Sequence, residues 1–173
     1  VEIQEALDSG ACGIIIPNIK NEIQLQKAIS FSCWPPKGNR GVGFSRANIF
    51  GKIFEKYNKF AQNPFLVAMV ECKDGLENIE AISKNNDLDA ILIGPYDLSA
   101  SLGQTGNFKN KKFILTINKI IKICKKNKMP VGIHQVQPIP KELKKLIKKG
   151  LNFIPYGIDT SFLNFNCKVP KLK

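Results

Sequence analysis

Short apolar runs alternate with longer amphipathic stretches along the chain. The apolar runs are continuous and do not alternate with polar residues, which is typical of strands that are buried on both faces of a parallel sheet. We therefore expect strands at 12–17, 65–70, 90–93, 131–133 and 153–156. Helical patterns lie between them, at 21–30, 49–61, 75–84, 111–127 and 140–149, and an earlier helix should stop at Gly10.

This alternation predicts βαβ units and therefore an α/β fold with a parallel sheet. Two architectures stay open: a doubly wound open sheet, and the last part of an eight-stranded (β/α)₈ barrel. The length of 173 residues favours the open sheet, because a complete barrel typically needs about 250 residues. The same length and a hydrophobic content of 43% predict a single domain over residues 1–173.

Positive charge is concentrated in the last part of the chain. Residues 1–100 hold 10 basic and 12 acidic side chains, and residues 101–173 hold 16 and 2, so charges of −2 and +14 give the total of +12. Surfaces that bind nucleic acid usually add arginines and exposed aromatic rings, whereas these residues are lysines on helical patterns. We interpret them as solvated helix faces and expect no nucleic-acid partner.

The sequence also indicates in which cellular compartment the protein is expected. No apolar run approaches the roughly 20 residues of a membrane-spanning helix, so we expect no membrane partner. The five cysteines form no C-x-x-C pair, which favours a reducing cytoplasm. The chain begins with Val1 and shows no secretory leader, and we expect that it starts partway through a gene.

Two acidic residues follow neighbouring apolar runs. Glu71 comes directly after the run at 65–70, and Asp97 comes shortly after the run at 90–93. The carboxyl ends of parallel strands meet at one edge of the sheet, where ligands bind in α/β proteins. Two converging carboxylates favour Mg²⁺ or Mn²⁺, because these ions prefer oxygen ligands. The alternative is that both acids only cap loops or helices.

Three other features are candidates for binding or catalysis. The segment 94–103 has glycine and proline at a strand end, where free backbone N–H groups could hold an anion, although a simple turn capped by Asp97 or Ser99 would look the same. Arg40 and Arg46 are the only arginines and fit a structural loop clamp better than a substrate contact. His134, the only histidine, could be a general base, a substrate contact or a structural residue.

Several segments, in this order, resemble the HpcH/HpaI aldolase family of metal-dependent class II pyruvate aldolases. They are Leu7-Asp-Ser-Gly-Ala-Cys-Gly-Ile-Ile-Ile-Pro17, Trp34-Pro-Pro-Lys-Gly-Asn-Arg-Gly-Val-Gly43, Ser45-Arg-Ala47, Glu71 with Gly75-Leu-Glu-Asn78, Ile93-Gly-Pro-Tyr-Asp-Leu-Ser-Ala-Ser-Leu-Gly103 and Gly157-Ile-Asp-Thr160. The resemblance implies a (β/α)₈ barrel of the phosphoenolpyruvate/pyruvate-binding type. This chain would supply strands four to eight, as the C-terminal part of the barrel.

The resemblance also implies roles for individual residues. Glu71 and Asp97 match the metal ligands, for Mg²⁺, Mn²⁺ or Co²⁺. Gly94, Pro95, Tyr96 and Asp97 match the segment that binds substrate, and the backbone amides of Tyr96 and Asp97 would hold the pyruvate carboxylate.

Two further positions follow from the same resemblance. Asp8 matches an aspartate that pairs with a catalytic histidine across a subunit contact, so we expect a homo-oligomer. Met69 stands where many members have a substrate-contacting glutamine. The catalytic histidine and an arginine that stabilises the enolate would precede Val1, and Pro170 would interrupt a C-terminal helix at 164–173.

The activity that the resemblance implies is cleavage or formation of a 4-hydroxy-2-oxo (2-keto-3-deoxy) acid. The products of cleavage would be pyruvate and an aldehyde, by way of an enolate that the metal stabilises as a Lewis acid. Related barrels offer one alternative, a lyase of the citryl- or malyl-CoA type. A second alternative is a non-catalytic remnant that only assembles with partners.

Overall fold

The structure is a computed structural model, and it describes residues 2–167. Its centre is a parallel sheet in the order β1-β2-β3-β4, formed by β1 (Gly13–Ile16), β2 (Phe65–Val70), β3 (Ala90–Ile93) and β4 (Val131–Ile133). Ile15 pairs with Val67, Ala68 with Ile91 and Leu92 with Gly132. The parallel α/β sheet that the sequence predicts is confirmed.

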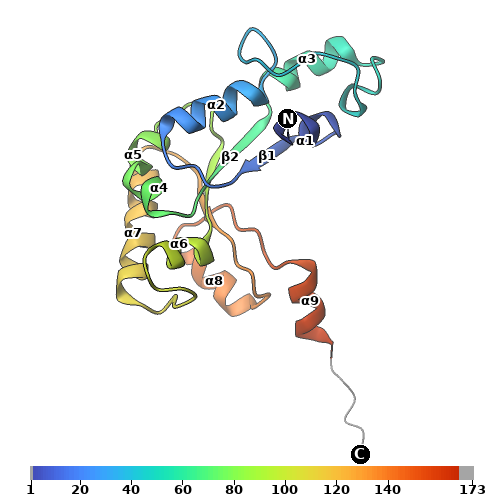
Figure 1. Ribbon diagram of the computed structural model, residues 1–173. Helices are drawn as coiled ribbons and strands as arrows, with labels where there is room; N and C mark the ends of the chain where they lie inside the picture. Colours follow the sequence, from blue (N-terminus) through green and yellow to red (C-terminus); the bar gives the residue numbers. More distant parts are fainter. Residues whose placement is uncertain (1, 168–173) are drawn as a thin grey trace, which may run out of the picture.

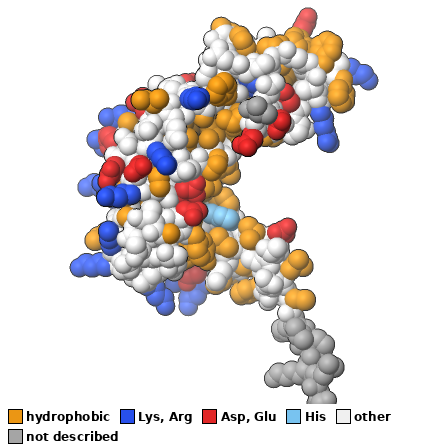
Figure 2. All heavy atoms as spheres, viewed as in Figure 1, with side chains coloured by type: hydrophobic (Ala, Val, Ile, Leu, Met, Phe, Trp, Pro, Cys, Tyr) orange, Lys and Arg blue, Asp and Glu red, His pale blue; other side chains and the backbone are white. Residues whose placement is uncertain are grey.

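Helices connect the strands. In chain order they are α1 (Glu2–Asp8), α2 (Glu22–Ser32), the 3₁₀ helix η1 (Arg46–Asn48), α3 (Phe54–Gln62), α4 (Lys73–Glu77), α5 (Ile79–Ile82), α6 (Pro95–Ser101), α7 (Lys111–Lys126), α8 (Pro140–Lys148) and α9 (Asp159–Asn166). Of these, α2, α4, α5 and α7 lie along one side of the sheet (Figure 1). The space-filling view shows a hollow on the opposite side of the molecule (Figure 2). Among the described residues, no helix combines the length and the apolarity needed to cross a membrane.

The two faces of the sheet differ in how well they are covered. On the helix side, alternate residues of the strands such as Leu66 and Ile91 are fully buried in a large core with α2, α5 and α7. On the hollow side, the smaller cluster contains Val67 and Leu92, while Ile15 keeps 43% of its surface exposed. An open doubly wound sheet carries helices on both faces. Helices on one face alone are the arrangement of a barrel wall.

The fifth expected strand is the part of the sheet prediction that is not realised. Residues 153–156 form only isolated bridges, between Gly132 and Phe153 and between Gln135 and Tyr156. Pro155 lies inside this segment and has no N–H to donate, so a continuous ladder cannot form there.

Several helix boundaries also differ from the expected ones. The helix expected over 49–61 begins only at Phe54, because Ile49 and Phe50 have left-handed backbone angles (φ 53° and 51°). The helix expected over 75–84 is divided at Asn78. α6 and α9 were not expected from periodicity, and Pro170 lies outside the described residues. Gly10 and Gly150 follow helix ends with φ of 109° and 87°, as predicted.

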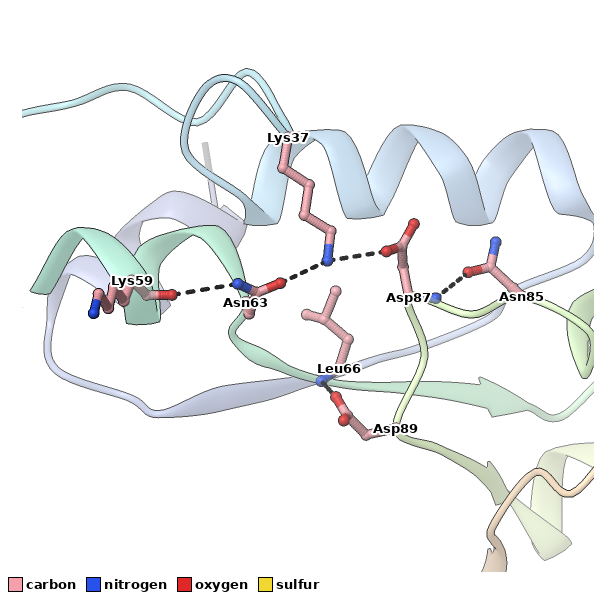
Figure 3. Close-up of polar contacts among 7 residues, drawn as sticks. All are labelled: Lys37, Lys59, Asn63, Leu66, Asn85, Asp87 and Asp89. Carbon is pink, nitrogen blue, oxygen red and sulfur yellow. Dashed lines mark hydrogen bonds and ion pairs between the residues drawn. The ribbon is translucent and has the colours of Figure 1, made fainter.

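A polar network fastens the amino-terminal edge of the sheet (Figure 3). The Lys37 ammonium pairs with Asp87 at 2.9 Å and donates to Asn63 Oδ1 at 2.9 Å. The carboxylate of Asp89 accepts the backbone N–H of Leu66 at 2.7 Å, at the start of β2. Each carboxylate at this edge therefore has a donor, and the network joins the segments before α3, β2 and β3.

Candidate metal and substrate site

Glu71 and Asp97 lie at the opposite, carboxyl-terminal edge of the sheet. Glu71 directly follows β2, and Asp97 lies in the first turn of α6, which follows β3. Since β2 and β3 are neighbouring parallel strands, their ends bring the two side chains together. Figure 2 shows acidic side chains beside the hollow of the molecule, next to the histidine.

A backbone contact positions the Glu71 side chain. The N–H of Asn18 donates to Glu71 Oε1 at 2.7 Å, and the next amide, Ile19 N–H, donates to the Met69 carbonyl at 3.1 Å. Asn18 has a left-handed φ of 53°, which turns the chain across the end of β2. Sequence reasoning missed Asn18. The available signal was an asparagine directly after Pro17 at a strand end, since asparagine tolerates this conformation.

Gly94 makes room for the Glu71 carboxylate. A Cβ atom at position 94 would lie 2.7 Å from Glu71 Oε2, 2.8 Å from Glu71 Cβ and 3.3 Å from Met69 Sδ. Carbon atoms do not approach other atoms so closely without displacement. The close packing of the two strand ends around Glu71 therefore requires glycine at this position.

Burial raises the pKa of Glu71, and the bond from Asn18 N–H opposes that change. The nearby Asp97 raises the pKa further, by repulsion and by a side-chain hydrogen bond. Two carboxylates that are close together disfavour each other's charge, and a divalent cation between them would reverse this effect. No group of three or more potential metal-ligating His, Cys, Asp or Glu residues is present among residues 2–167. One or two carboxylates, with water and substrate, are a common donor set for Mg²⁺ and Mn²⁺.

The segment that follows Gly94 is a helix start. Gly94 is the N-cap of α6, Pro95 is its first residue, and Asp97 and Ser99 lie inside the helix. The alternative turn capped by Asp97 or Ser99 is therefore wrong. Ser99 Oγ instead donates to the Tyr96 carbonyl at 2.7 Å and accepts Gly106 N–H at 2.9 Å. Early amides of a helix have no partner within it, and Pro95 has no N–H, so Tyr96 and Asp97 present the first ones.

Comparison with known proteins identifies the family. The family model described as HpcH/HpaI aldolase/citrate lyase matches residues 1–164. A 5-keto-4-deoxy-D-glucarate aldolase of Citrobacter koseri is 31% identical over 160 residues, which are 92% of this chain and 62% of that protein. A corresponding aldolase of Escherichia coli O157:H7 is 30% identical over the same share. The chain belongs to the HpcH/HpaI aldolase/citrate lyase family.

Solved structures of HpcH/HpaI proteins have the same fold. The crystal structure of a member from Burkholderia cenocepacia matches with a TM-score of 0.87 and 27% identity, over 94% of this chain and 65% of that one. An HpcH/HpaI aldolase from Desulfitobacterium hafniense matches with a TM-score of 0.81 and 22% identity, over 94% and 63%. The sheet is thus part of a (β/α)₈ barrel, and the open sheet that length favoured is wrong because this chain spans less than two thirds of its relatives.

Met69 lies close to the carboxylate pair of Glu71 and Asp97, whereas Asp8 lies far from it along the sheet. Met69 is the last but one residue of β2, on the hollow side, near Gly94. Asp8 ends α1, ahead of β1, and accepts a bond from Gln4 Nε2 at 3.2 Å. It therefore belongs to the other edge of the sheet from Glu71. Within this chain the two do not meet, and the role of Asp8 at a subunit contact stays a prediction.

The remaining candidates are His134 and the two arginines, and they lie in different parts of the molecule. His134 follows β4 at the same edge as Glu71, and its Nε2 lies 3.4 Å from the Gly157 carbonyl oxygen. Arg40 is only 2% exposed, its guanidinium carbon lies 5.6 Å and 6.0 Å from the ring centroids of Trp34 and Tyr57, and its Nη2 donates to the Tyr57 hydroxyl at 3.3 Å. This placement is that of a loop clamp. Arg46 is exposed in η1.

Proposed function

We propose that this chain is part of a metal-dependent aldolase that interconverts a 4-hydroxy-2-oxo acid with pyruvate and an aldehyde. The observation that carries the proposal is the convergence of Glu71 and Asp97, with the pKa of Glu71 raised by burial and by its neighbour. Membership of the HpcH/HpaI family and the aldolase activity for which the similar proteins are named support it. The chain spans 62% of the length of such a relative, so the activity is proposed for the whole protein.

The metal would be a divalent ion, Mg²⁺, Mn²⁺ or Co²⁺, held by the carboxylates of Glu71 and Asp97. When bound, such an ion supplies Lewis-acid stabilisation of negative charge on a substrate oxygen. Glu71 is suited to this role because Asn18 N–H fixes one of its oxygens while the other faces Gly94. The repulsion between the two carboxylates also favours binding of a cation between them at neutral pH, in preference to a proton that both would share.

Binding of the 2-oxo acid would depend on the start of α6. The backbone N–H groups of Tyr96 and Asp97 are proposed to hold the substrate carboxylate, with Gly94 and Pro95 shaping the turn that presents them. Met69 would contact the substrate from the hollow side of β2. Because Met69 accepts or donates no strong hydrogen bond, it would provide packing without polar recognition.

In the cleavage direction, the bond between C3 and C4 of the oxo acid breaks. The C4 hydroxyl loses its proton to a base, C4 becomes the aldehyde carbon, and the electron pair left on C3 takes up a proton to give pyruvate. The resemblance assigns the base to a histidine oriented by Asp8 across a subunit contact. We therefore propose a homo-oligomer as the active form.

Metal binding is testable on the 173-residue chain itself. Titration with Mn²⁺, followed by electron paramagnetic resonance or calorimetry, should show one site, and Glu71→Gln and Asp97→Asn should each weaken it at least ten-fold. Glu77→Gln, an exposed glutamate on α4, is the matched control and should leave Mn²⁺ binding unchanged. Equal binding by all these variants would reject the assigned ligands.

Activity is testable on the product of the whole gene. It should release pyruvate from a 4-hydroxy-2-oxo acid, and a chelator such as EDTA should abolish the release until Mg²⁺ or Mn²⁺ is restored. Cleavage that persists in EDTA would reject the metal-dependent mechanism. No turnover of any such acid with metal present would favour the non-catalytic remnant.

The family description also includes citrate lyase, which favours one second candidate, a lyase of the citryl- or malyl-CoA type. The same enzyme preparation separates the two. Release of acetyl-CoA from malyl-CoA or citryl-CoA, without cleavage of free 4-hydroxy-2-oxo acids, would establish this alternative.

A further inference from the structure

A cavity of about 380 Å³ lies between α6 and α8, beside the first turn of α6, which carries Asp97. Pro95 and Tyr96, which directly precede Asp97, form one wall, and His134 and the segment leading into α8 form the other. This volume is within the usual range of small-molecule sites. All of the wall comes from residues of this chain that the structure describes.

The wall is mainly apolar. Tyr96 and Phe108 meet edge to face, with ring centroids 4.9 Å apart, and present an aromatic surface. The other apolar side chains that line the cavity are Ile133, Val136, Ile139 and Leu146. Such a surface binds aromatic or aliphatic groups by the removal of apolar area from water.

The wall of the cavity offers no cationic partner to an anionic ligand. Among the described residues, Glu142 lines the cavity, and no lysine or arginine does. The Glu142 carboxylate is already paired with Lys145 at 2.7 Å, and this contact, with weaker effects from Lys141 and Lys109, lowers its pKa. A carboxylate inside the mainly apolar cavity would therefore lose its water without gaining an ion pair from the wall.

Gln135 is an unusual polar member of this wall. Its Nε2 donates to the carbonyl oxygens of Gln137 at 3.0 Å and Ile139 at 2.8 Å, which fixes the orientation of the amide and shapes the loop. Its Oε1 is buried and has no hydrogen-bond partner among residues 2–167. An acceptor left in this state is unfavourable. Gln135 lines the cavity, so a ligand hydroxyl there is the donor that this oxygen lacks, and the contact requires the amide to shift against its two Nε2 bonds.

We propose that this cavity binds the aldehyde half of the substrate, and that this half is uncharged, largely apolar and carries a hydroxyl group. The assignment to the aldehyde half rests on the proposed function. The substrate named for the relatives, 5-keto-4-deoxy-D-glucarate, is a sugar dicarboxylate. The proposed aldehyde half therefore differs from that substrate in having no carboxylate.

Three matched probes test the chemistry of the cavity without metal or pyruvate. They are 3-hydroxyacetophenone, 3-methylacetophenone and 3-acetylbenzoate, which are methyl ketones because the many lysines would condense with aldehydes. Calorimetry or ligand-observed NMR on the purified chain should rank hydroxyl above methyl above carboxylate. We expect the hydroxyl probe to bind roughly two- to ten-fold more tightly than the methyl probe, which is the effect of one neutral hydrogen bond. The carboxylate probe should bind at least ten-fold more weakly.

Variants connect these affinities to named residues. Gln135→Met removes the acceptor and should equalise the hydroxyl and methyl probes, whereas Gln26→Met, on the exposed side of α2, should leave the ranking intact. Because Gln135 also holds the loop, Leu146→Phe provides a second variant. It should fill part of the cavity from α8 and weaken all three probes, with the fold checked by circular dichroism.

The outcomes separate this inference from the proposed function. Failure of every probe to bind, binding that Leu146→Phe leaves unchanged, or equal affinity for the hydroxyl and carboxylate probes would overturn the inference. If the probes behave as expected while cleavage of 4-hydroxy-2-oxo acids resists EDTA, the cavity stands as a ligand site and the metal-dependent aldolase does not.

Discussion

Acidic side chains occupy both edges of the same sheet, yet their surroundings are opposite. At the amino-terminal edge, Asp89 accepts a buried backbone amide and Asp87 pairs with Lys37. At the carboxyl-terminal edge, Glu71 faces Asp97, and neither forms an ion pair with a Lys or Arg among the described residues. Satisfied carboxylates hold the fold together. A converging pair in which burial and the neighbouring carboxylate raise the pKa of Glu71 is the pattern of a functional site.

The largest effect is expected from Gly94→Ala, which removes the space that the carboxyl-terminal edge requires. The added Cβ would meet Glu71 Cβ as well as its carboxylate, so the backbone of β2 or α6 must shift. We expect a loss of about 1–3 kcal/mol in the free energy of unfolding, measured by denaturant titration, together with weaker Mn²⁺ binding. The control is Gly43→Ala, because no atom lies within 4 Å of a Cβ there. Equal effects of the two substitutions would contradict the argument.

At the amino-terminal edge, Asp89→Ala should destabilise the chain by about 1–2 kcal/mol, because the buried Leu66 N–H loses its acceptor. Asp87→Asn should lower the free energy of unfolding by less, at most about 1 kcal/mol, since the ion pair of Asp87 with Lys37 is partly solvated. Neither substitution should change Mn²⁺ affinity. A change in metal binding would show that the two edges are coupled.

In metal-free buffer, Glu71→Gln should stabilise the folded chain, whereas Asp89→Ala should destabilise it. Removing a charge that is partly buried and repelled by Asp97 should raise the thermal midpoint, while Gln can still accept the bond from Asn18 N–H. Glu80→Gln is the matched control, because Lys126 and Lys84 lower the pKa of Glu80 and its charge is favourable. A lower midpoint for Glu71→Gln without metal would mark Glu71 as structural.

The smallest effect concerns pH. The pKa of Glu71 is higher in the folded chain than in the unfolded one, so its ionisation disfavours folding above the folded pKa. The stability advantage of Glu71→Gln should therefore be full above that pKa, decline as the pH falls through it, and vanish below the ordinary glutamate pKa of 4.5. Thermal midpoints of both proteins across this window, without metal, measure the difference. A constant difference would reject the raised pKa.

Much of the fold was predictable because buried parallel strands leave an unambiguous signal. The runs at β2, β3 and β4 contain few polar residues, and their ends are marked by glycine, proline or charge. Helix periodicity located α2, α7 and α8 in the same way. It failed at 49–61, where Ile49 and Phe50 adopt left-handed angles that no apolar pattern reports. It also failed at α6, whose Gly-Pro start hides a short helix.

The candidate site was predictable only in part, since a sequence gives strand ends but not side-chain contacts. The order of strands was enough to expect Glu71 and Asp97 to meet. The role of Gly94 depends on distances of 2.7–3.3 Å to Glu71 and Met69, which follow from three-dimensional packing. The contribution of Asn18 comes from its backbone N–H, which every residue other than proline carries. The side chain gave only an indirect signal, the tolerance of asparagine for left-handed backbone angles.

The missing Cβ at position 94 also constrains how this protein can evolve. A lineage that replaces Gly94 must first accept glycine at position 71 or a displaced strand, because the clash includes the Cβ of Glu71, and either step disturbs the acidic pair. Functional descendants should therefore keep the residues at positions 71 and 94 together. Descendants that have lost the pair should show both positions drifting freely.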